Sequence, residues 1–483
     1  MNRQISRLSV AVLLLFGALF INLNYITLIQ SDELANHTAN RRLIIQEYAI
    51  ERGPIVVGEQ AIARSTPSDD DTLQFRRSYP DGELYAHLTG YHSFLLQRSG
   101  LEQALHEDLT GRPTELLAQN LAQLIGGMDR PGNAVELTVD AEVQTAARAA
   151  LDGREGAVVA VDPRSGGVLA AYANPTFDPN PLSSHDTVEI TDAWSQLRDD
   201  PDQPLLDRTI SETYAPGSAF KVLVAAAALE EGMEPSETFP DEGEYDVPQT
   251  DANIRNFGSG FCHDGDEITL SAALVVSCNT VFARLGVELG EDVLREQSER
   301  FGFNQSIPYE LSVTASSFPD DLDVPATAQS SIGQRDVRAT PMQMALVAAG
   351  VANNGEIMRP HVVRSVRDPD GQVIRGPADG VWDGLPGGGQ AVSPRTAGQL
   401  REMMIETVES GTGRAAAIGG VTVGGKTGTA QTGGDPTAWF IGFAGDEVAV
   451  AVVLPEAGPD ATGGGVAAPV ARAVMAAALE RDG

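Results

Sequence analysis

The pattern of apolar and polar residues divides the chain into an apolar N-terminal run, a mixed segment and a longer unit of strands and helices. The apolar run covers residues 8–29, is broken by two asparagines, and is long enough to cross a bilayer, which takes about 20 apolar residues. Arg3 and Arg7 precede it with no acidic residue, and no Ala-x-Ala site follows. We expect an uncleaved signal anchor. A cleaved signal peptide is the alternative, because the most apolar part, residues 8–21, is short.

Residues 30–150 are mixed in polarity and contain no cluster of reactive side chains, so we interpret them as a non-catalytic pedestal. An extended segment is expected to begin at residues 51–55, and a helix is expected to begin at residues 100–102. A strand over residues 136–140 is expected to lead into a helix over residues 141–151.

The remaining residues, 151–483, predict one larger unit. Its predicted strands cover residues 156–162, 167–172, 421–431, 438–443 and 447–454, and Pro163-Arg-Ser-Gly166 joins the first two as a hairpin. A mostly helical insertion over residues 205–420 separates the strands, and a final helix covers residues 466–480. We expect an α+β fold in which both ends of the unit build one five-stranded antiparallel sheet flanked by helices.

Two parts of the insertion differ from the rest in composition. Residues 220–229 are almost all apolar, and a helix without a polar face must be buried on every side. Residues 366–390 are rich in Gly, Asp and Pro, which predicts a hairpin and an exposed loop.

The charge balance narrows the range of partners. Acidic residues outnumber basic residues 67 to 33, which gives a net charge of -34. Because phosphate binding requires a basic surface, we expect no nucleic-acid partner. The excess of acid fits adaptation to salt and fits a solvated surface equally well.

Cys262 and Cys278 are the only cysteines of the chain. Outside the cytoplasm, a pair at this spacing is expected to form a disulfide, which stabilises by about 3 kcal/mol in the chain-entropy model. Metal binding is the weaker alternative, because the histidines and cysteines show neither His-x-x-x-His nor Cys-x-x-Cys spacing.

The chain has only two lysines, Lys221 and Lys426, against 31 arginines. An ammonium can lose its proton when desolvated, whereas a guanidinium stays protonated. The two lysines are therefore candidates for chemistry that arginine cannot perform, unless they are surface residues that survived by chance.

Ser218 and Lys221 form a Ser-x-x-Lys pair at the start of the apolar helix. Residues three apart lie on one face of a helix, and burial there lowers the pKa of a lysine. A neutral amine beside a hydroxyl can act as general base and activate a nucleophile. Taken alone, the tetrapeptide is equally explained by an N-cap serine and an unrelated lysine.

A second motif, Ser277-Cys-Asn279, follows a short apolar segment. Its hydroxyl and amide, two residues apart on a loop, can relay a proton and hold a substrate amide. Serine and asparagine are also common helix caps, so this motif alone is a weak signal.

A third motif, Lys426-Thr427-Gly428-Thr429, lies on a predicted strand. Glycine in a strand often marks close approach by another backbone, and a peptide could pair along such an edge. Lys426 and the two threonine hydroxyls would then bind a terminal carboxylate. The simpler explanation is a glycine-rich bulge.

Ser-x-x-Lys, Ser-x-Asn and Lys-Thr-Gly in this order form the combined signature of penicillin-binding proteins and serine β-lactamases. The chain resembles a class B penicillin-binding protein, most closely the actinobacterial penicillin-binding protein A group, over nearly its whole length. Further matching segments are Glu51-Arg-Gly-Pro-Ile55, Ala86-His-x-x-Gly-Tyr91, Gly100-Leu-Glu102, Ser331-Ile-Gly-Gln334 and Trp439-Phe-Ile-Gly-Phe443. The resemblance implies a D,D-transpeptidase that cross-links peptidoglycan in wall synthesis and division, is acylated by β-lactams, and needs no cofactor or metal.

The resemblance also implies a role for each reacting side chain. Ser218 would attack the carbonyl of a terminal D-Ala-D-Ala bond while Lys221 takes its proton. Ser277, with Lys426 nearby, would help to protonate the departing D-alanine. Asn279 would hold the donor peptide.

The same resemblance assigns Thr427, Gly428 and Thr429 to substrate binding. The backbone N–H groups of Ser218 and Thr429 would form an oxyanion hole. A disulfide at the middle residue of the Ser-x-Asn motif would pin the loop that carries this motif.

The implied organisation is a cytoplasmic tail over residues 1–7, an anchor over 8–29, a pedestal of the dimerisation type over 30–150 and a penicillin-binding transpeptidase domain over 151–483. It places the catalytic domain outside the plasma membrane on a single-pass anchor. There it would meet stem peptides ending in D-Ala-D-Ala and β-lactams. A glycan polymerase of the SEDS family is the implied protein partner.

Other functions share part of this pattern. A serine β-lactamase has the same three motifs, but the only Leu-Asn pair, Leu23-Asn24, lies in the apolar run, so the usual Glu-x-x-Leu-Asn element is missing. A D,D-carboxypeptidase uses the same acylation and is not separated by residues alone. A non-enzymatic β-lactam sensor or division scaffold is disfavoured, because every reacting side chain is present and only residues 1–7 are predicted to be cytoplasmic.

Overall fold

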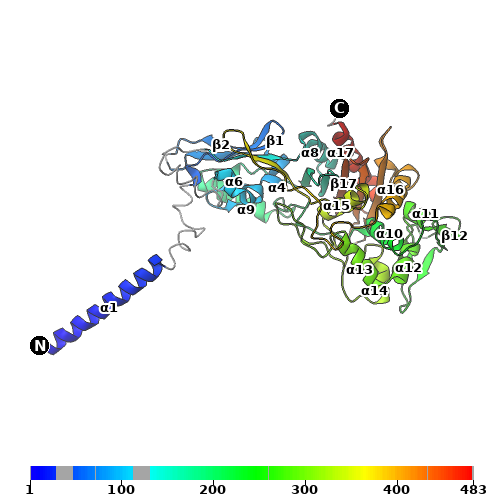
Figure 1. The fold of residues 1–483 in the computed structure, drawn as a ribbon, viewed down its shortest axis with the longest axis horizontal. Helices are drawn as coiled ribbons and strands as arrows, with labels where there is room; N and C mark the ends of the chain where they lie inside the picture. The colour runs from blue at the N-terminus through cyan, green and yellow to red at the C-terminus, as the bar shows by residue number, and fades with distance from the viewer. Residues whose placement is uncertain are drawn as a thin grey trace.

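The computed structural model describes residues 2–28, 47–70, 72–111, 131–258, 260–431 and 433–480. Helix α1 (Asn2–Leu28) contains an apolar stretch, Ile5–Tyr25, that is long enough to cross a membrane and is 0% buried. The other elements form a pedestal, drawn mainly in blue and cyan with one yellow segment in Figure 1, and a larger unit that contains the C-terminus.

The larger unit is built on a five-stranded antiparallel sheet in the order β15-β16-β17-β7-β8. Its strands are β7 (Gly156–Val161), β8 (Val168–Asn174), β15 (Val423–Ala430), β16 (Thr437–Ala444) and β17 (Val448–Leu454). The prediction of one sheet made from both ends of the unit is confirmed, since β17 pairs with β7 and Ala451 lies opposite Val159. Every residue of β7, β16 and β17 is buried, which explains their continuous apolar sequences.

Helices cover this sheet. Helix α8 (Ala141–Leu151) and helix α17 (Ala468–Glu480) pack against each other and against strands of the sheet. Helix α15 (Pro341–Ala352) packs on β7, β16 and β17, and all of its residues are buried. Helix α10 (Lys221–Glu230) is buried at every position before its last residue, as predicted for a helix without a polar face.

The insertion supplies most of the remaining elements of this unit. Its helices and helical turns are η3 (Gly217–Phe220), α11 (Leu270–Val275), α12 (Asn279–Leu289), α13 (Glu291–Arg300), α14 (Val324–Ser330), α16 (Pro394–Glu409) and η4 (Arg414–Ala416). Outside the insertion, η5 (Gly463–Ala467) leads into α17, and η2 (Pro181–Ser183) and α9 (Thr187–Asp199) follow β8 and pack against each other, with η2 also in contact with the pedestal. Two short antiparallel pairs join β9 (Thr238–Pro240) to β12 (Glu267–Thr269) and β10 (Glu244–Asp246) to β11 (Asn253–Arg255).

The pedestal is built on a six-stranded sheet in the order β14-β13-β6-β1-β2-β3. Four strands come from the pedestal segment: β1 (Ile55–Val57), β2 (Gln60–Pro67), β3 (Phe75–Ser78) and β6 (Ala134–Leu137). The other two, β13 (Val363–Arg367) and β14 (Val373–Arg375), come from the second half of the chain and form the expected hairpin. The short elements α4 (Gly82–Thr89), β4 (His92–Ser93), β5 (Gln97–Arg98), α5 (Gly100–Ala104) and α6 (His106–Thr110) complete the pedestal.

The strand expected over residues 136–140 is displaced towards the N-terminus. Strand β6 ends at Leu137. The next residue, Thr138, already contacts the larger unit, because its hydroxyl donates to the carbonyl oxygen of Val168, the first residue of β8, at 2.8 Å. Asp140 then caps α8, and its side chain accepts hydrogen bonds from the backbone N–H groups of Glu142 and Val143.

Buried charges fill the core of the pedestal. The carboxylate of Glu102 accepts hydrogen bonds from Nε of Arg52 and Nε of Arg77, both at 2.6 Å. Burial alone would raise the pKa of Glu102, but the charges and hydrogen bonds of Arg77 and Arg52 lower it. Two of the segments that carry the family resemblance, at residues 51–55 and 100–102, therefore meet at one ion cluster.

Candidate active site

Ser218 lies on the short helical turn η3 that leads directly into α10. The sequence predicts that this serine begins the α-helix itself. In the structure it lies instead on the tighter turn η3, which starts at Gly217, where φ is 52°. The backbone N–H of Gly217 donates to the carbonyl oxygen of Gly333 at 2.9 Å, which fixes the turn against the segment resembling the family at residues 331–334. Ser218 itself is half-buried.

Lys221, the first residue of α10, is fully buried and points to the Ser277 loop. Its Nζ donates to the carbonyl oxygen of Ser277 at 2.8 Å and to Oδ1 of Asn279 at 2.7 Å, and lies 3.4 Å from Oγ of Ser277. In the described part of the chain no hydrogen bond joins Lys221 to the hydroxyl of Ser218. Burial, with a smaller effect of the Lys426 charge, holds the pKa of Lys221 well below its ordinary value.

Ser277 lies between α11 and α12 with its backbone in the left-handed region, at φ of 64°. A residue other than glycine rarely adopts this conformation, which is found at sites where the surroundings impose it. The side-chain nitrogen of Asn279 donates to the carbonyl oxygen of Arg255 at 2.9 Å. The two residues of the Ser-x-Asn motif are thus each held in one orientation.

Lys426 approaches the same serine hydroxyl from β15. Its Nζ donates to Oγ of Ser277 at 2.9 Å and to the carbonyl oxygen of Thr427 at 2.9 Å. The side chain is fully buried, and this burial lowers the pKa of Lys426 to about 7. The hydroxyl of Ser277 therefore lies between two lysine amines, and both lysines of the chain belong to one cluster.

Strand β15 is an edge strand that lies against the turn bearing Ser218. A Cβ atom built on Gly428 would lie 2.5 Å from the carbonyl oxygen of Pro216, so glycine is required for this approach. A Cβ atom on Gly217 would likewise lie 2.6 Å from the carbonyl oxygen of Thr429. The backbones of Ser218 and Thr429, the two residues predicted to form an oxyanion hole, are thereby close neighbours.

The threonines of β15 are anchored to neighbouring segments. The hydroxyl of Thr427 lies 2.7 Å from the hydroxyl of Thr412, in the Gly-Thr-Gly sequence at residues 411–413. The hydroxyl of Thr429 accepts a hydrogen bond from the backbone N–H of Gly463 at 3.2 Å. The Gly411-Thr-Gly413 segment also carries the family resemblance, but the contact of Thr412 with Thr427 was not predicted, because it joins distant segments.

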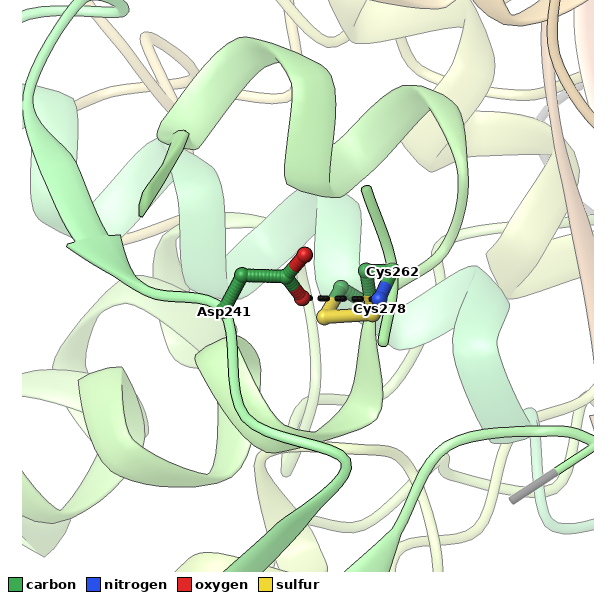
Figure 2. Close-up of side chains that lie close together, drawn as sticks. All are labelled: Asp241, Cys262 and Cys278. Atoms are coloured by element: carbon green, nitrogen blue, oxygen red, sulfur yellow. Dashed lines mark hydrogen bonds between the residues drawn. A yellow bond between two sulfur atoms is a disulfide. The ribbon is translucent and has the colours of Figure 1, made fainter. Parts of the chain in front are cut away.

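The cysteines form the predicted disulfide, with a Cα–Cα distance of 5.7 Å. Figure 2 shows the bridge beside the carboxylate of Asp241, which accepts a hydrogen bond from the backbone N–H of Cys262 at 2.7 Å. The three side chains are close enough to suggest a metal site, but both sulfurs are used in the bridge, so they are not available as metal ligands. Sequence reasoning did not identify Asp241.

A half-buried serine on a helical turn, a buried lysine with a lowered pKa and a second serine–lysine pair beside an open strand edge define a class of enzyme. This is the arrangement of proteins that form an acyl intermediate on serine without using histidine.

Comparisons with known proteins agree with this class. The family model for the penicillin-binding protein transpeptidase domain matches residues 156–476, and the model for the penicillin-binding protein A dimerisation domain matches residues 52–135. The chain therefore belongs to the penicillin-binding proteins that carry a transpeptidase domain.

Relatives and solved structures of this family match the chain over most or all of its length. The peptidoglycan D,D-transpeptidase PbpA of Mycolicibacterium smegmatis is 39% identical, and that of Mycobacterium tuberculosis is 38% identical, each over 100% of both chains. The ceftriaxone acyl-enzyme of penicillin-binding protein A from M. tuberculosis superposes with a TM-score of 0.85 at 38% identity, covering 90% of this chain and 100% of that one. The penicillin G acyl-enzyme of the same protein has a TM-score of 0.83.

Proposed function

We propose that this chain is a peptidoglycan D,D-transpeptidase that works through an acyl-enzyme on Ser218. The full-length likeness to proteins of that name supports the activity, and the solved acyl-enzymes of the relative support covalent capture of β-lactams. The residue assignment rests on one cluster, in which Lys221 and Lys426 both contact Ser277 and Lys221 also contacts Asn279. Lys221 lies three residues after Ser218 in the sequence.

In the acylation step, Oγ of Ser218 attacks the carbonyl carbon of the penultimate D-alanine, and its proton passes to Nζ of Lys221. A neutral amine has two hydrogens and one lone pair. The carbonyl oxygen of Ser277 and Oδ1 of Asn279 occupy the two hydrogens, and the lone pair is left to accept a proton; the further contact of Nζ, with Oγ of Ser277, is longer, at 3.4 Å. The backbone N–H groups of Ser218 and Thr429 stabilise the oxyanion, each worth about 2.7–4 kcal/mol.

Collapse of this intermediate breaks the C–N bond, and the departing D-alanine nitrogen must gain a proton. Ser277 supplies it and is resupplied by Lys426, whose Nζ donates to Oγ of Ser277. The amine of a second stem peptide then attacks the acyl-enzyme and loses a proton to the same relay. The ester C–O bond to Ser218 breaks, and Lys221 returns its proton to Oγ of Ser218. Thr427 and Thr429 hold the carboxylate end of the donor along the edge of β15.

We further propose that α1 anchors the enzyme in the plasma membrane with residues 1–7 on the cytoplasmic side, that residues 30–150 act as the pedestal, and that residues 151–483 form the catalytic domain. The apolar, unburied surface of α1 and the two arginines before residue 8 support the anchor. A SEDS-type glycan polymerase is the partner proposed from the family.

Treatment with a fluorescent penicillin tests this assignment. The chain should be labelled covalently, and Ser218→Ala should abolish the label, whereas Ser410→Ala, a change at an exposed serine on the C-terminal end of α16, should not. Persistent labelling of the Ser218→Ala protein would remove Ser218 as nucleophile. Fast loss of the label from the unmodified chain would favour a β-lactamase, and release of D-alanine without cross-linking would favour a carboxypeptidase.

A further inference from the structure

The helix that begins at Asn279 takes its N-terminal cap from a distant residue. The side chain of Cys278, at the cap position, accepts no hydrogen bond from a backbone N–H group of the helix. Instead, the backbone N–H groups of Asn279 and Thr280 donate to Oδ1 of Asn256, at 2.9 Å and 3.1 Å. One amide oxygen therefore satisfies two of the free N–H groups at the start of α12.

The amide of Asn256 is itself fixed in place. Its nitrogen donates to the carbonyl oxygens of Glu242 and Gly260, at 2.9 Å and 3.0 Å, and lies 3.3 Å from the hydroxyl of Thr280. The side chain is buried, and only one orientation of the amide places its oxygen at N–H groups and its nitrogen at carbonyl groups. A buried amide with all its groups paired is costly to remove.

Asn279 connects this cap to the catalytic lysine. Its backbone is held by Asn256, its side-chain nitrogen by the carbonyl oxygen of Arg255, and its side-chain oxygen accepts from Nζ of Lys221 at 2.7 Å. The positions of Asn279 Oδ1 and of the Ser277 carbonyl decide where the two hydrogens of a neutral Lys221 point. They therefore also decide where its lone pair points.

Asp241 holds the segment that begins at Cys262, which the disulfide joins to Cys278. Its carboxylate accepts hydrogen bonds from the backbone N–H groups of Cys262, His263 and Gly265, at 2.7, 2.7 and 2.9 Å. The disulfide passes this restraint from Cys262 to Cys278, next to Asn279 (Figure 2). The loop at residues 277–279 is thus held by two side chains, Asn256 directly and Asp241 through the disulfide. The hydrogen bonds by which these two side chains hold it go to backbone groups and not to the two lysines.

We propose that Asn256 is a positioning residue for acylation, which orients Lys221 through Asn279, and that Asp241 supports it through the disulfide. This inference rests on the proposed function of Ser218 and Lys221. It assigns to Asn256 no contact with substrate, only control over the geometry of the amine that accepts the serine proton.

The test compares Asn256→Ala with Asp140→Ala in the full-length chain. Asp140 is a matched control, because its side chain also accepts hydrogen bonds from two N–H groups at a helix start, at α8. We expect the second-order rate constant for acylation by a fluorescent penicillin to fall at least about tenfold in Asn256→Ala and to change less than about twofold in Asp140→Ala. An unchanged rate in Asn256→Ala, or an equal fall in both variants, would overturn the proposal.

A second variant separates positioning from loss of folding. Asn256→Asp keeps the oxygen that accepts from the two N–H groups, loses the hydrogen bonds donated to the carbonyl oxygens of Glu242 and Gly260, and adds a negative charge that is linked to Lys221 through Asn279. We expect a rate above that of Asn256→Ala and a rising pH limb displaced to higher pH, because the added charge favours protonated Lys221. A rate no better than that of Asn256→Ala, with an undisplaced limb, would refute the inference. Failure of the unmodified chain to be labelled would instead refute the proposed function.

Discussion

At the scale of single residues, the site depends on two lysines whose charge the fold suppresses. Lys221 and Lys426 are both fully buried and both contact Ser277, so each loses hydration, and the charge of Lys426 further disfavours the charged form of Lys221. Arginine in either position would stay protonated and could neither accept nor return a proton near neutral pH. This explains why a chain with 31 arginines keeps lysine at these two positions.

These lowered pKa values predict the pH dependence of acylation. Because only neutral Lys221 accepts a proton, the rate constant should rise with pH through the pKa of Lys221 and level off well below the ordinary lysine value. Lys426 loses its proton above a pH of about 7, so a falling limb is expected there if its proton is needed. Stopped-flow measurement of acylation by penicillin from about pH 5 to about pH 10 would reveal both limbs.

Lys221→Arg provides the control for this profile. It keeps a positive charge at the position but cannot accept the serine proton, so the rate constant should fall by about a hundredfold or more at every pH. A Lys221→Arg protein as fast as the unmodified chain would show that no proton passes to this side chain.

The residues proposed to react could be selected from the sequence, whereas the residues that hold them could not. Ser218, Lys221 and Lys426 belong to short motifs whose chemistry is legible in the residue types. Asn256 and Asp241 act on the motif loop from positions more than twenty residues away in the sequence. No periodicity or spacing connects an isolated asparagine in a loop to a helix that begins at Asn279, so the contact appears only in three dimensions.

At the scale of elements, the site depends on how closely β15 approaches the turn that carries Ser218. The sequence predicted close approach by another backbone at the glycines of this strand, and at Gly428 the other backbone is the turn itself. Gly424 and Gly425 have a different reason: a Cβ atom on either would meet the rings of Phe443 and Phe440. The sequence predicted one antiparallel sheet made from both ends of the unit, but it did not predict these ring contacts.

Gly428→Ala should therefore separate the two backbones that are proposed to form the oxyanion hole. The added Cβ would lie 2.5 Å from the carbonyl oxygen of Pro216 and 2.9 Å from Cβ of Trp439, so we expect a stability loss of about 1–3 kcal/mol. Displacement of the strand should also slow acylation by about tenfold or more. Denaturant unfolding and labelling kinetics would measure the two effects.

Gly398→Ala is the matched control, because Gly398 lies on α16 with no atom within 4 Å of an added Cβ. Alanine in place of glycine in a helix should stabilise by up to about 1 kcal/mol and leave acylation unchanged. Equal kinetics for both variants would contradict a role for the close approach at Gly428.

At the scale of the whole molecule, the pedestal and the larger unit share a sheet. Strand β13 lies between β14 and β6, so the hairpin at residues 363–375 extends the pedestal sheet although the segments on either side of it belong to the larger unit. The hairpin itself was predicted from its turn residues, but its pairing with β6 was not, since residues over two hundred positions apart leave no local signal. The two units are therefore expected to lose their structure together.

Glu102→Gln tests this coupling from the pedestal side. The change leaves the guanidinium groups of Arg52 and Arg77 buried without their carboxylate, and removal of one partner of a buried ion cluster costs about 3–5 kcal/mol. Because β13 joins the units, we expect the temperature at which penicillin labelling is lost to fall together with the midpoint of unfolding by circular dichroism. Glu234→Gln, which breaks a solvent-exposed pair with Arg395, should lower stability by no more than about 1 kcal/mol. Labelling that survives after the pedestal of the Glu102→Gln protein has unfolded would show that the catalytic unit stands independently of it.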